Sequence, residues 1–130
     1  MARPDYDSLL DWLRERFGDD LRWVASFDSD RFDYRIRYVR DDLRTELTEQ
    51  RLDVIVHRSM AVYNRRHLED VYNYLGAAEC LVVQHDRATA VHLYLDGATG
   101  VVVKLSTDAE VTVPTFREEA TARLFPDPDR

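Results

Sequence analysis

The stretch from Cys80 to Ser106 constrains the fold most, because it contains three short apolar runs separated by two turn signals. The runs are rich in Val, Leu and Tyr, which favour β-strands. The gaps between them read Asp-Arg-Ala-Thr and Asp-Gly-Ala-Thr-Gly, which favour turns. The pattern predicts three consecutive strands of one antiparallel meander.

A two-residue loop at 87–88 would set the register of the first two strands of this meander. It would place Gln84 opposite Val91 and Val82 opposite Leu93. Because side chains alternate between the two faces of a strand, one face is expected to form the core. That face holds Cys80, Val82, Val91, Leu93 and Leu95. The other carries Leu81, Val83, His85, His92 and Tyr94, a mixed set that a helix or a partner chain could cover.

The first 39 residues predict a helix followed by a β-hairpin. Apolar residues recur at helical spacing from Tyr6 to Phe17, and Gly18 ends the helix. Alternation over 21–27 predicts a strand with the inward set Leu21, Trp23, Ala25 and Phe27. Residues 31–39 alternate most regularly, with Phe32, Tyr34, Ile36 and Tyr38 on one face and Arg31, Asp33, Arg35 and Arg37 on the other.

The middle of the chain predicts a helix from an N-cap at Thr48 to about Asn64. Its apolar stripe consists of Leu52, Ile55, Val56, Ser59, Met60 and Tyr63. Arg65 and Arg66 interrupt this stripe, so either the helix bends there or a second helix starts and runs towards Gly76. After the meander, residues 116–125 predict a short helix with Phe116, Ala120 and Leu124 on one side.

These elements follow one another in the order α-β-β-α-β-β-β-α. We expect an α+β fold in which the two groups of strands share a single five-stranded antiparallel sheet, with helices on one or both faces. The chain contains 130 residues without an internal repeat or linker, which predicts one domain over 1–130 with a frayed tail at 126–130.

The charge composition indicates the solvent conditions in which the protein works more clearly than it indicates a binding partner. The net charge is −7, from 17 Asp and 8 Glu against 17 Arg and one Lys. An Asp-rich, Lys-poor surface is typical of proteins from salt-accumulating halophiles, although a genome of high GC content would also favour Arg and Asp. With no signal-peptide core and no long apolar run, the sequence predicts a cytoplasmic protein that does not bind membranes.

No residue pattern predicts catalysis, a metal or a cofactor. The lone Cys80 can form neither an internal disulfide nor a usual zinc site. His85 and His92 would share a face of the meander, but no third ligand has suitable spacing. His57 falls beside the apolar stripe of the middle helix, where a packed or interface histidine is expected. Phosphate-binding glycine loops and nucleophile motifs are absent, so we expect a protein that is not an enzyme.

Arginines on the second strand suggest an alternative binding surface. Arg31, Arg35 and Arg37, continued by Arg40, would form a row in which arginines at i and i+2 lie about 7 Å apart, suited to nucleic acid or an acidic protein. The competing interpretation is that Asp28, Asp30 and Asp33 neutralise this row through local ion pairs. Because Tyr34 and Tyr38 point to the other face, a nucleic-acid partner is not favoured.

The element order, the segment L-G-A-A-E-C-L-V-V-Q-H-D, the turn and strand D-G-A-T-G-V-V-V-K-L and the closing helix resemble the roadblock/dynein-light-chain superfamily, which is profilin-like in fold. The chain also resembles a small uncharacterised haloarchaeal family of similar size. The resemblance implies a non-enzymatic scaffold that homodimerises through its middle helix and the adjacent sheet edge, possible partners including an NTPase or a signalling protein. The implied interface residues are Leu52, Ile55, Val56, Ser59, Met60, Tyr63, Cys80, Val82 and Gln84.

The segment from Cys80 to Gln84 agrees with this interface on physical grounds. It lacks the charge, proline or bulge that usually protects an edge strand from pairing with another chain. The alternative is that this strand lies in the middle of the sheet beside residues 21–27, where it would need no protection.

Overall fold

A computed structural model describes residues 3–31 and 33–126. The expectations for Phe32 and for the tail at 127–130 therefore lie outside the described residues. The main elements are α1 (Tyr6–Phe17), β1 (Leu21–Asp28), β2 (Asp33–Val39), α2 (Leu47–Val71), β3 (Cys80–Gln84), β4 (Thr89–Tyr94), β5 (Thr99–Leu105) and α3 (Thr115–Leu124). Short 3-10 turns η1 (Gly18–Asp20), η2 (Asp41–Glu46) and η3 (Asn73–Leu75) flank α1 and α2.

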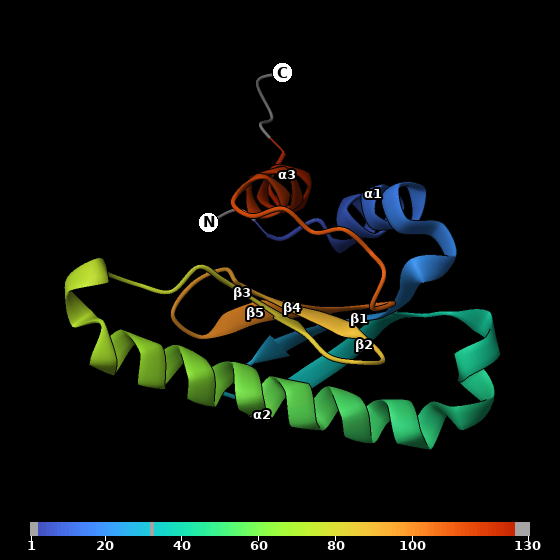
Figure 1. Cartoon of the computed structure of the whole chain (residues 1–130), viewed down its shortest axis with the longest axis horizontal. Helices are drawn as coiled ribbons and strands as arrows, with labels where there is room; N and C mark the ends of the chain where they lie inside the picture. The colour runs from blue at the N-terminus through green and yellow to red at the C-terminus, as the bar shows by residue number, and fades with distance from the viewer. Residues whose placement is uncertain (1–2, 32, 127–130) are drawn as a thin grey trace.

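The five strands form a single antiparallel sheet in the order β2-β1-β5-β4-β3. Helices α1 and α3 lie side by side on one face, and the long α2 lies across the other (Figure 1). The expected α+β class is therefore confirmed. Strand β3 lies at an edge of the sheet, and β5 occupies the place beside β1, so the mid-sheet alternative for β3 is wrong.

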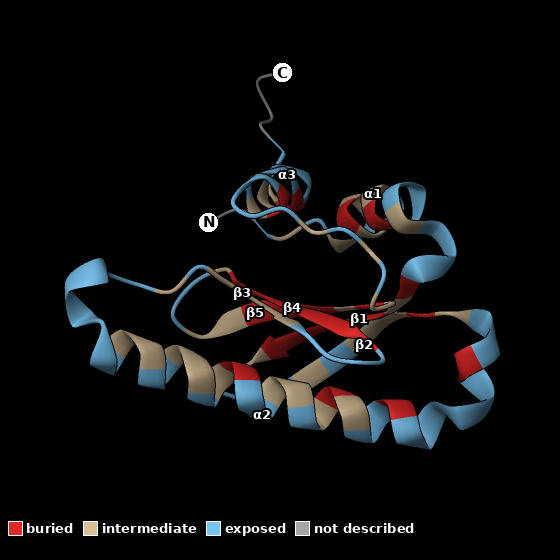
Figure 2. Cartoon of the chain, viewed as in Figure 1, coloured by how far each residue is buried: buried red, intermediate tan, exposed pale blue. Residues whose placement is uncertain are grey.

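Each face of the sheet has its own apolar core, and the central strands are buried on both faces (Figure 2). The core beneath α1 and α3 includes Leu9, Leu13, Val91, Leu93, Val103, Phe116, Ala120 and Leu124. The core beneath α2 includes Trp23, Ala25, Phe27, Val54, Ala61, Tyr94 and Val102. The predicted inner side of the last helix is confirmed.

Two irregularities correct the faces expected for the first hairpin. The pairing of β1 with β5 shifts between Leu21 and Trp23, so Leu21 packs beneath α1 while the rest of its predicted set packs beneath α2. The pairing of β1 with β2 also shifts, which places Tyr38 beneath α1 and leaves Tyr34 and Ile36 beneath α2. A β-bulge adds one residue to one strand and so reverses the alternation that a sequence pattern assumes.

The register expected for the meander is wrong by two residues. Val82 pairs with Val91, and Gln84 pairs with Thr89. The connection has four residues instead of two, closed by the bond from the His85 backbone N–H to the Ala88 carbonyl at 2.7 Å. Because a shift of two residues keeps every side chain on its face, the predicted core face of the meander is nevertheless observed.

Helix α2 continues through Arg65 and Arg66, so it neither ends near Asn64 nor gives way to a second α-helix. Arg65 lies partly buried over the Tyr94 ring, 4.9 Å from its centroid, and its Nη1 donates to the Asp96 carbonyl. A charged side chain can occupy this position because its stem packs while its guanidinium finds polar partners. Within residues 3–31 and 33–126, none of the helices is long and apolar enough to cross a membrane.

Candidate functional site

The outer face of α2 is apolar and exposed. Leu52, Val56, Met60 and Tyr63 keep 59%, 58%, 45% and 63% of their surface accessible, with Ser59 exposed and Ile55 half-buried between them. The helix contacts the sheet instead through its other side, where Gln50, Val54 and Ala61 are buried. Four more exposed apolar residues lie at or just beyond the C-terminal end of α2: Val71, Tyr72, Tyr74 and Leu75.

The unpaired edge of β3 lies next to this helix. Two of the interface residues expected there, Cys80 and Val82, direct their side chains to the core beneath α1 and α3, while Gln84 is exposed and donates to the Thr107 carbonyl at 3.2 Å. Burial raises the pKa of the Cys80 thiol to about 11. The α2 side of β3 instead carries Leu81 and Val83, which lie opposite His92 and Ala90. Alternation places both on that face, although the implied interface does not include them.

A cavity of about 360 Å³ separates the outer face of α2 from β3. Its apolar wall comes from Val56 and Met60 of α2, Val83 of β3 and Ala90 of β4. Its polar lining consists of Asp53, His57, Asn64, His85, His92 and Lys104. The cavity therefore touches the apolar stripe of α2 through Val56 and Met60, and it touches the α2 side of β3, which the implied interface does not include.

A chain of polar contacts occupies the inner end of this cavity. Asp53 accepts from Lys104 Nζ at 3.0 Å and from Trp23 Nε1 at 3.0 Å. Lys104 Nζ also lies 2.6 Å from His57 Nε2, and His57 Nδ1 lies 3.4 Å from His92 Nε2. Sequence reasoning missed this group, because its members come from several elements and each appears as a single polar residue in an apolar pattern.

The contacts define where the protons lie. An ammonium group only donates, so Nε2 of His57 accepts the hydrogen bond from Lys104. The proton of the neutral His57 ring is therefore on Nδ1. That proton is directed at His92 Nε2, which leaves the His92 proton on Nδ1. The His92 side chain is 2% exposed, and its Nδ1 has no hydrogen-bond partner among the described residues. Burial, with lesser contributions from neighbouring positive groups, lowers the pKa of His57 and of His92 to about 4.

The free energy of unfolding is expected to decrease as the pH falls from 7 to 5. Unfolded histidine takes up a proton near pH 6.5, whereas the folded pKa of His92 is about 4. The unfolded state therefore binds more protons in this window, which costs on the order of 2 kcal/mol for His92 by pH 5. Urea titrations at the two pH values measure the difference. His92→Phe should reduce the loss of stability between pH 7 and pH 5. An equal loss in wild type and in His92→Phe would contradict the low pKa of His92 in the folded state.

His85 and His92 do share a cavity, as their common face suggested, and the His92 ring contacts that of His57, at 5.6 Å between ring centroids. Among the residues that the structure describes, no group of three or more His, Cys, Asp or Glu side chains is arranged to hold a metal ion.

The arginines of the alternative surface are separated by local contacts. Arg31 lies 3.9 Å from an Asp28 oxygen, and Arg37 donates to Ser26 Oγ at 3.0 Å while it stacks 3.9 Å from the Tyr6 ring centroid. Arg40 binds both carboxylate oxygens of Asp42, at 2.5 and 2.9 Å, which lowers the pKa of that carboxyl. Arg35 is exposed. The bulge in the hairpin and these contacts prevent a regular row.

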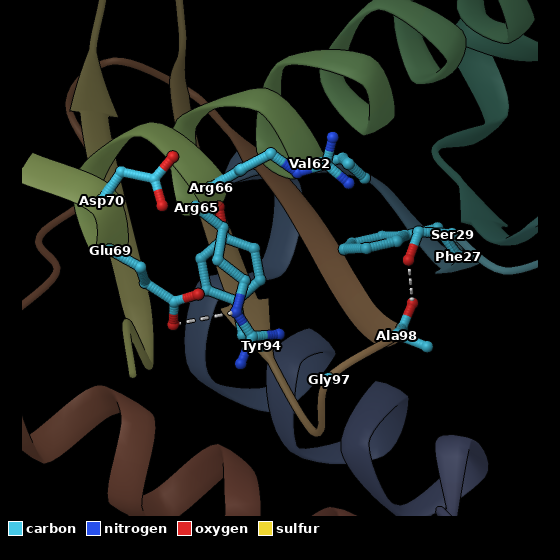
Figure 3. Close-up of a pocket in the computed structure, with 10 residues that line it drawn as sticks. All are labelled: Phe27, Ser29, Val62, Arg65, Arg66, Glu69, Asp70, Tyr94, Gly97 and Ala98. Carbon is cyan, nitrogen blue, oxygen red and sulfur yellow. Dashed lines mark hydrogen bonds and ion pairs between the residues drawn. The ribbon is translucent and has the colours of Figure 1, made fainter. Parts of the chain in front are cut away.

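A second, smaller cavity of about 200 Å³ lies between the C-terminal half of α2 and the β4–β5 turn (Figure 3). Arg65 and Glu69 converge there above Tyr94, with Arg65 Nε 3.4 Å from the Glu69 carboxylate. The Tyr94 hydroxyl donates to the Ala61 carbonyl at 2.6 Å, and burial raises its pKa to about 12. The polar groups of Arg65, Glu69 and Tyr94 thus have partners within the chain, and their contacts hold α2 against the β4–β5 turn.

The three-layer arrangement defines the fold class of the chain, an α+β fold with helices on both faces of one antiparallel sheet. A solved structure of the same architecture is that of the gliding protein MglB from Thermus thermophilus, with a TM-score of 0.58 and 13% sequence identity over 92% of this chain and 87% of that chain. At this identity the similarity shows the fold alone. The chain belongs to the family described as a domain of unknown function, DUF7522, whose model matches residues 7–125. No curated protein matches the sequence.

Proposed function

We propose that the chain is a non-enzymatic protein-interaction module, folded as one domain, that acts as a homodimer through α2 and β3. The observation that carries this proposal is the adjacency of an exposed apolar helix face and an unpaired strand edge. Exposed apolar surface of this kind on a folded protein marks an interaction site, and an unprotected edge strand accepts another strand.

A second copy of the chain fits both surfaces at once. Most soluble homodimers have two-fold symmetry, in which the same patch of each subunit meets itself. Antiparallel pairing of two β3 strands would continue the sheet across the dimer. Helix α2 packs mainly over β2 and β5, so the α2 side of β3 is available for the partner's helix. Val56 and Met60 line the same cavity as Val83, and on this basis we propose that this part of α2 lies closest to the two-fold axis.

The mass in solution tests the dimer, measured by light scattering in multimolar KCl. We expect a dimer for the wild type and a folded monomer for Met60→Glu, because the substitution buries a charge beside its symmetry copy. Val113→Glu is the matched control: Val113 is also exposed and apolar, with 49% of its surface accessible, but lies outside α2 and β3. A monomeric wild type, or dimers for both variants, would refute the interface.

Cross-linking gives the position of the axis. In a Cys80→Ser background, Met60→Cys is expected to form an interchain disulfide under mild oxidation, because two helices crossing near this residue bring the Cα atoms within the distance a disulfide spans. Tyr74→Cys, which is exposed but distant from the proposed axis, should not do so. Cross-linking of Tyr74→Cys alone would place the axis elsewhere.

We further propose that this dimer regulates a second protein in a halophilic cytoplasm, an NTPase or a signalling protein being the classes that the roadblock resemblance implies. The proposal requires a dimer-dependent complex. A candidate partner should bind the wild type and Val113→Glu with similar affinity and should bind Met60→Glu at least tenfold more weakly. The arginine alternative has less support, because Arg31, Arg37 and Arg40 already have partners within the chain.

A further inference from the structure

A further cavity, of about 360 Å³, lies where the N-terminal end of α1 meets β1 and β2. Its volume falls within the range of roughly 300–1,000 Å³ that small-molecule sites have. Strand β2 forms the edge of the sheet opposite to β3, so this cavity is separate from the surface assigned to the dimer. Its polar lining includes Tyr6, Ser26, Asp28, Asp33, Arg35 and Arg37.

Two guanidinium groups lie on the same side of this cavity. Arg35 pairs with Ser26 across the strands, so their side chains share one face of the sheet. Arg37, at the bulge, reaches the same face: its Nε donates to Ser26 Oγ at 3.0 Å, and its guanidinium stacks 3.9 Å from the Tyr6 ring centroid. These contacts orient Arg37 and leave its two Nη groups as donors. The Arg35 side chain is exposed and has no hydrogen bond or ion pair to any described residue.

Two carboxylates lie further along the same strands. Asp28 of β1 is directly opposite Asp33 of β2, and like charges in such a pair repel each other. Asp28 has local partners, since it accepts from the Asp30 backbone N–H at 3.0 Å and lies 3.9 Å from Arg31 Nε. The Asp33 side chain is exposed and has no hydrogen bond or ion pair to any described residue. It is therefore available to a positively charged group, which would also reduce its repulsion from Asp28.

We propose that this cavity binds a small zwitterion, a molecule whose carboxylate and ammonium groups are joined by a short chain. The carboxylate would accept from Arg35 and from the Nη groups of Arg37, whose fork of donors matches a carboxylate. The ammonium would lie against Asp33. A simple anion would also face the two carboxylates of the cavity, and a simple cation would face the two guanidinium groups. Among the described residues, no ion pair joins either arginine to Asp28 or Asp33, so the ligand would displace none.

The probe for this site is γ-aminobutyrate, in which a flexible chain separates the two charged groups. ¹H–¹⁵N NMR spectra of the arginine Nε–H groups would be recorded during titration, at the lowest KCl concentration at which circular dichroism shows the folded protein. We expect γ-aminobutyrate to shift the Arg37 Nε–H resonance saturably. Butyrate and butylammonium should bind at least fivefold more weakly, because each can form only one of the two ion pairs. Equal binding of butyrate, or no shift of Arg37 with γ-aminobutyrate, would overturn the proposal.

Two substitutions at exposed positions locate the ends of the ligand. Arg35→Gln and Asp33→Asn should each raise the Kd for γ-aminobutyrate at least fivefold. Asp33→Asn should also lower the Kd for butyrate, because it removes a like charge from the cavity. Arg44→Gln is the matched control: Arg44 is 67% exposed, lies in η2 outside the cavity, and should leave both Kd values unchanged. Unchanged affinity for γ-aminobutyrate in Arg35→Gln, or weaker binding of butyrate by Asp33→Asn, would refute the site.

Zwitterion binding goes beyond the proposed dimer and does not depend on it, because β2 and β3 are opposite edges of the sheet. Met60→Glu, the variant expected to be monomeric, should therefore bind γ-aminobutyrate with the wild-type Kd. Light scattering on the NMR samples gives the mass of each protein. A wild-type monomer that binds γ-aminobutyrate would refute the dimer and support the cavity proposal. A wild-type dimer whose Arg37 resonance does not respond would refute the cavity proposal and support the dimer.

Discussion

Gly100→Ala is expected to lower the free energy of unfolding by about 3 kcal/mol, the upper part of the range for overpacking a core. A Cβ at this position would lie 2.6 Å from the Leu93 carbonyl oxygen and would also collide with the Phe27 ring. The ring could rotate away, but the carbonyl belongs to the backbone of β4, which is paired with β5 along this stretch. The strands would therefore have to separate. Urea denaturation followed by circular dichroism measures the loss.

Gly97→Ala is the matched control for this prediction. Gly97 lies three residues earlier in the β4–β5 turn, and a Cβ there would meet nothing within 4 Å. We expect its free energy of unfolding to stay within about 0.5 kcal/mol of wild type, as for most surface substitutions. Similar stabilities for the two variants would show that β4 and β5 are not packed as closely as the structure describes.

Asp53→Leu is expected to cost about 2 kcal/mol of folding stability, less than the loss of a fully buried ion pair, because the Asp53 side chain is 35% exposed. It leaves the ammonium of Lys104, only 12% exposed, without its counter-ion, and it leaves the Trp23 indole N–H without an acceptor. Removing one partner of a buried pair costs more than removing both, because the remaining charge stays desolvated. The double variant Asp53→Leu/Lys104→Met should therefore be more stable than Asp53→Leu alone.

Asp53→Asn separates the two contributions. The amide oxygen can still accept from Trp23 Nε1, so this variant removes the charge and keeps the hydrogen bond. We expect it to be more stable than Asp53→Leu and less stable than wild type. Thermal unfolding of wild type, Asp53→Leu, Lys104→Met and the double variant gives the coupling between Asp53 and Lys104. A coupling energy near zero would show that Asp53 and Lys104 do not stabilise each other in the folded protein.

The fold was predictable because its information is local. Alternation in 21–27, 31–39 and the meander, together with helical spacing in 6–17 and 52–63, indicates the type of nearly every element. The predictions that were wrong concern the register of the meander and the faces of the first hairpin. A single bulge beside Trp23 or Arg37 reverses the direction of the following side chains, and no local signal in the sequence marks either one. Likewise, the length of the 85–88 loop depends on the strands that it joins.

The candidate site was predictable only in part. The apolar stripe of α2 and the unprotected edge of β3 are patterns within single segments, and the structure leaves both on the surface. The cavity between them has no such local pattern. Asp53 and Lys104 are separated by 51 residues along the chain, and each polar residue of the cavity suggests by itself only an isolated polar side chain.

The sequence by itself determined the α+β class, the order of elements and the acidic, lysine-poor composition, because these follow from periodicity and residue content, which do not depend on distant residues. Only the tertiary structure decided that β3 lies at an edge, that the α2 stripe faces away from the sheet, and that Lys104 meets His57 beneath the helix. Those facts depend on which strands pair and on which helix face the sheet buries. Both are determined by long-range contacts, whose free energies compete across the whole chain.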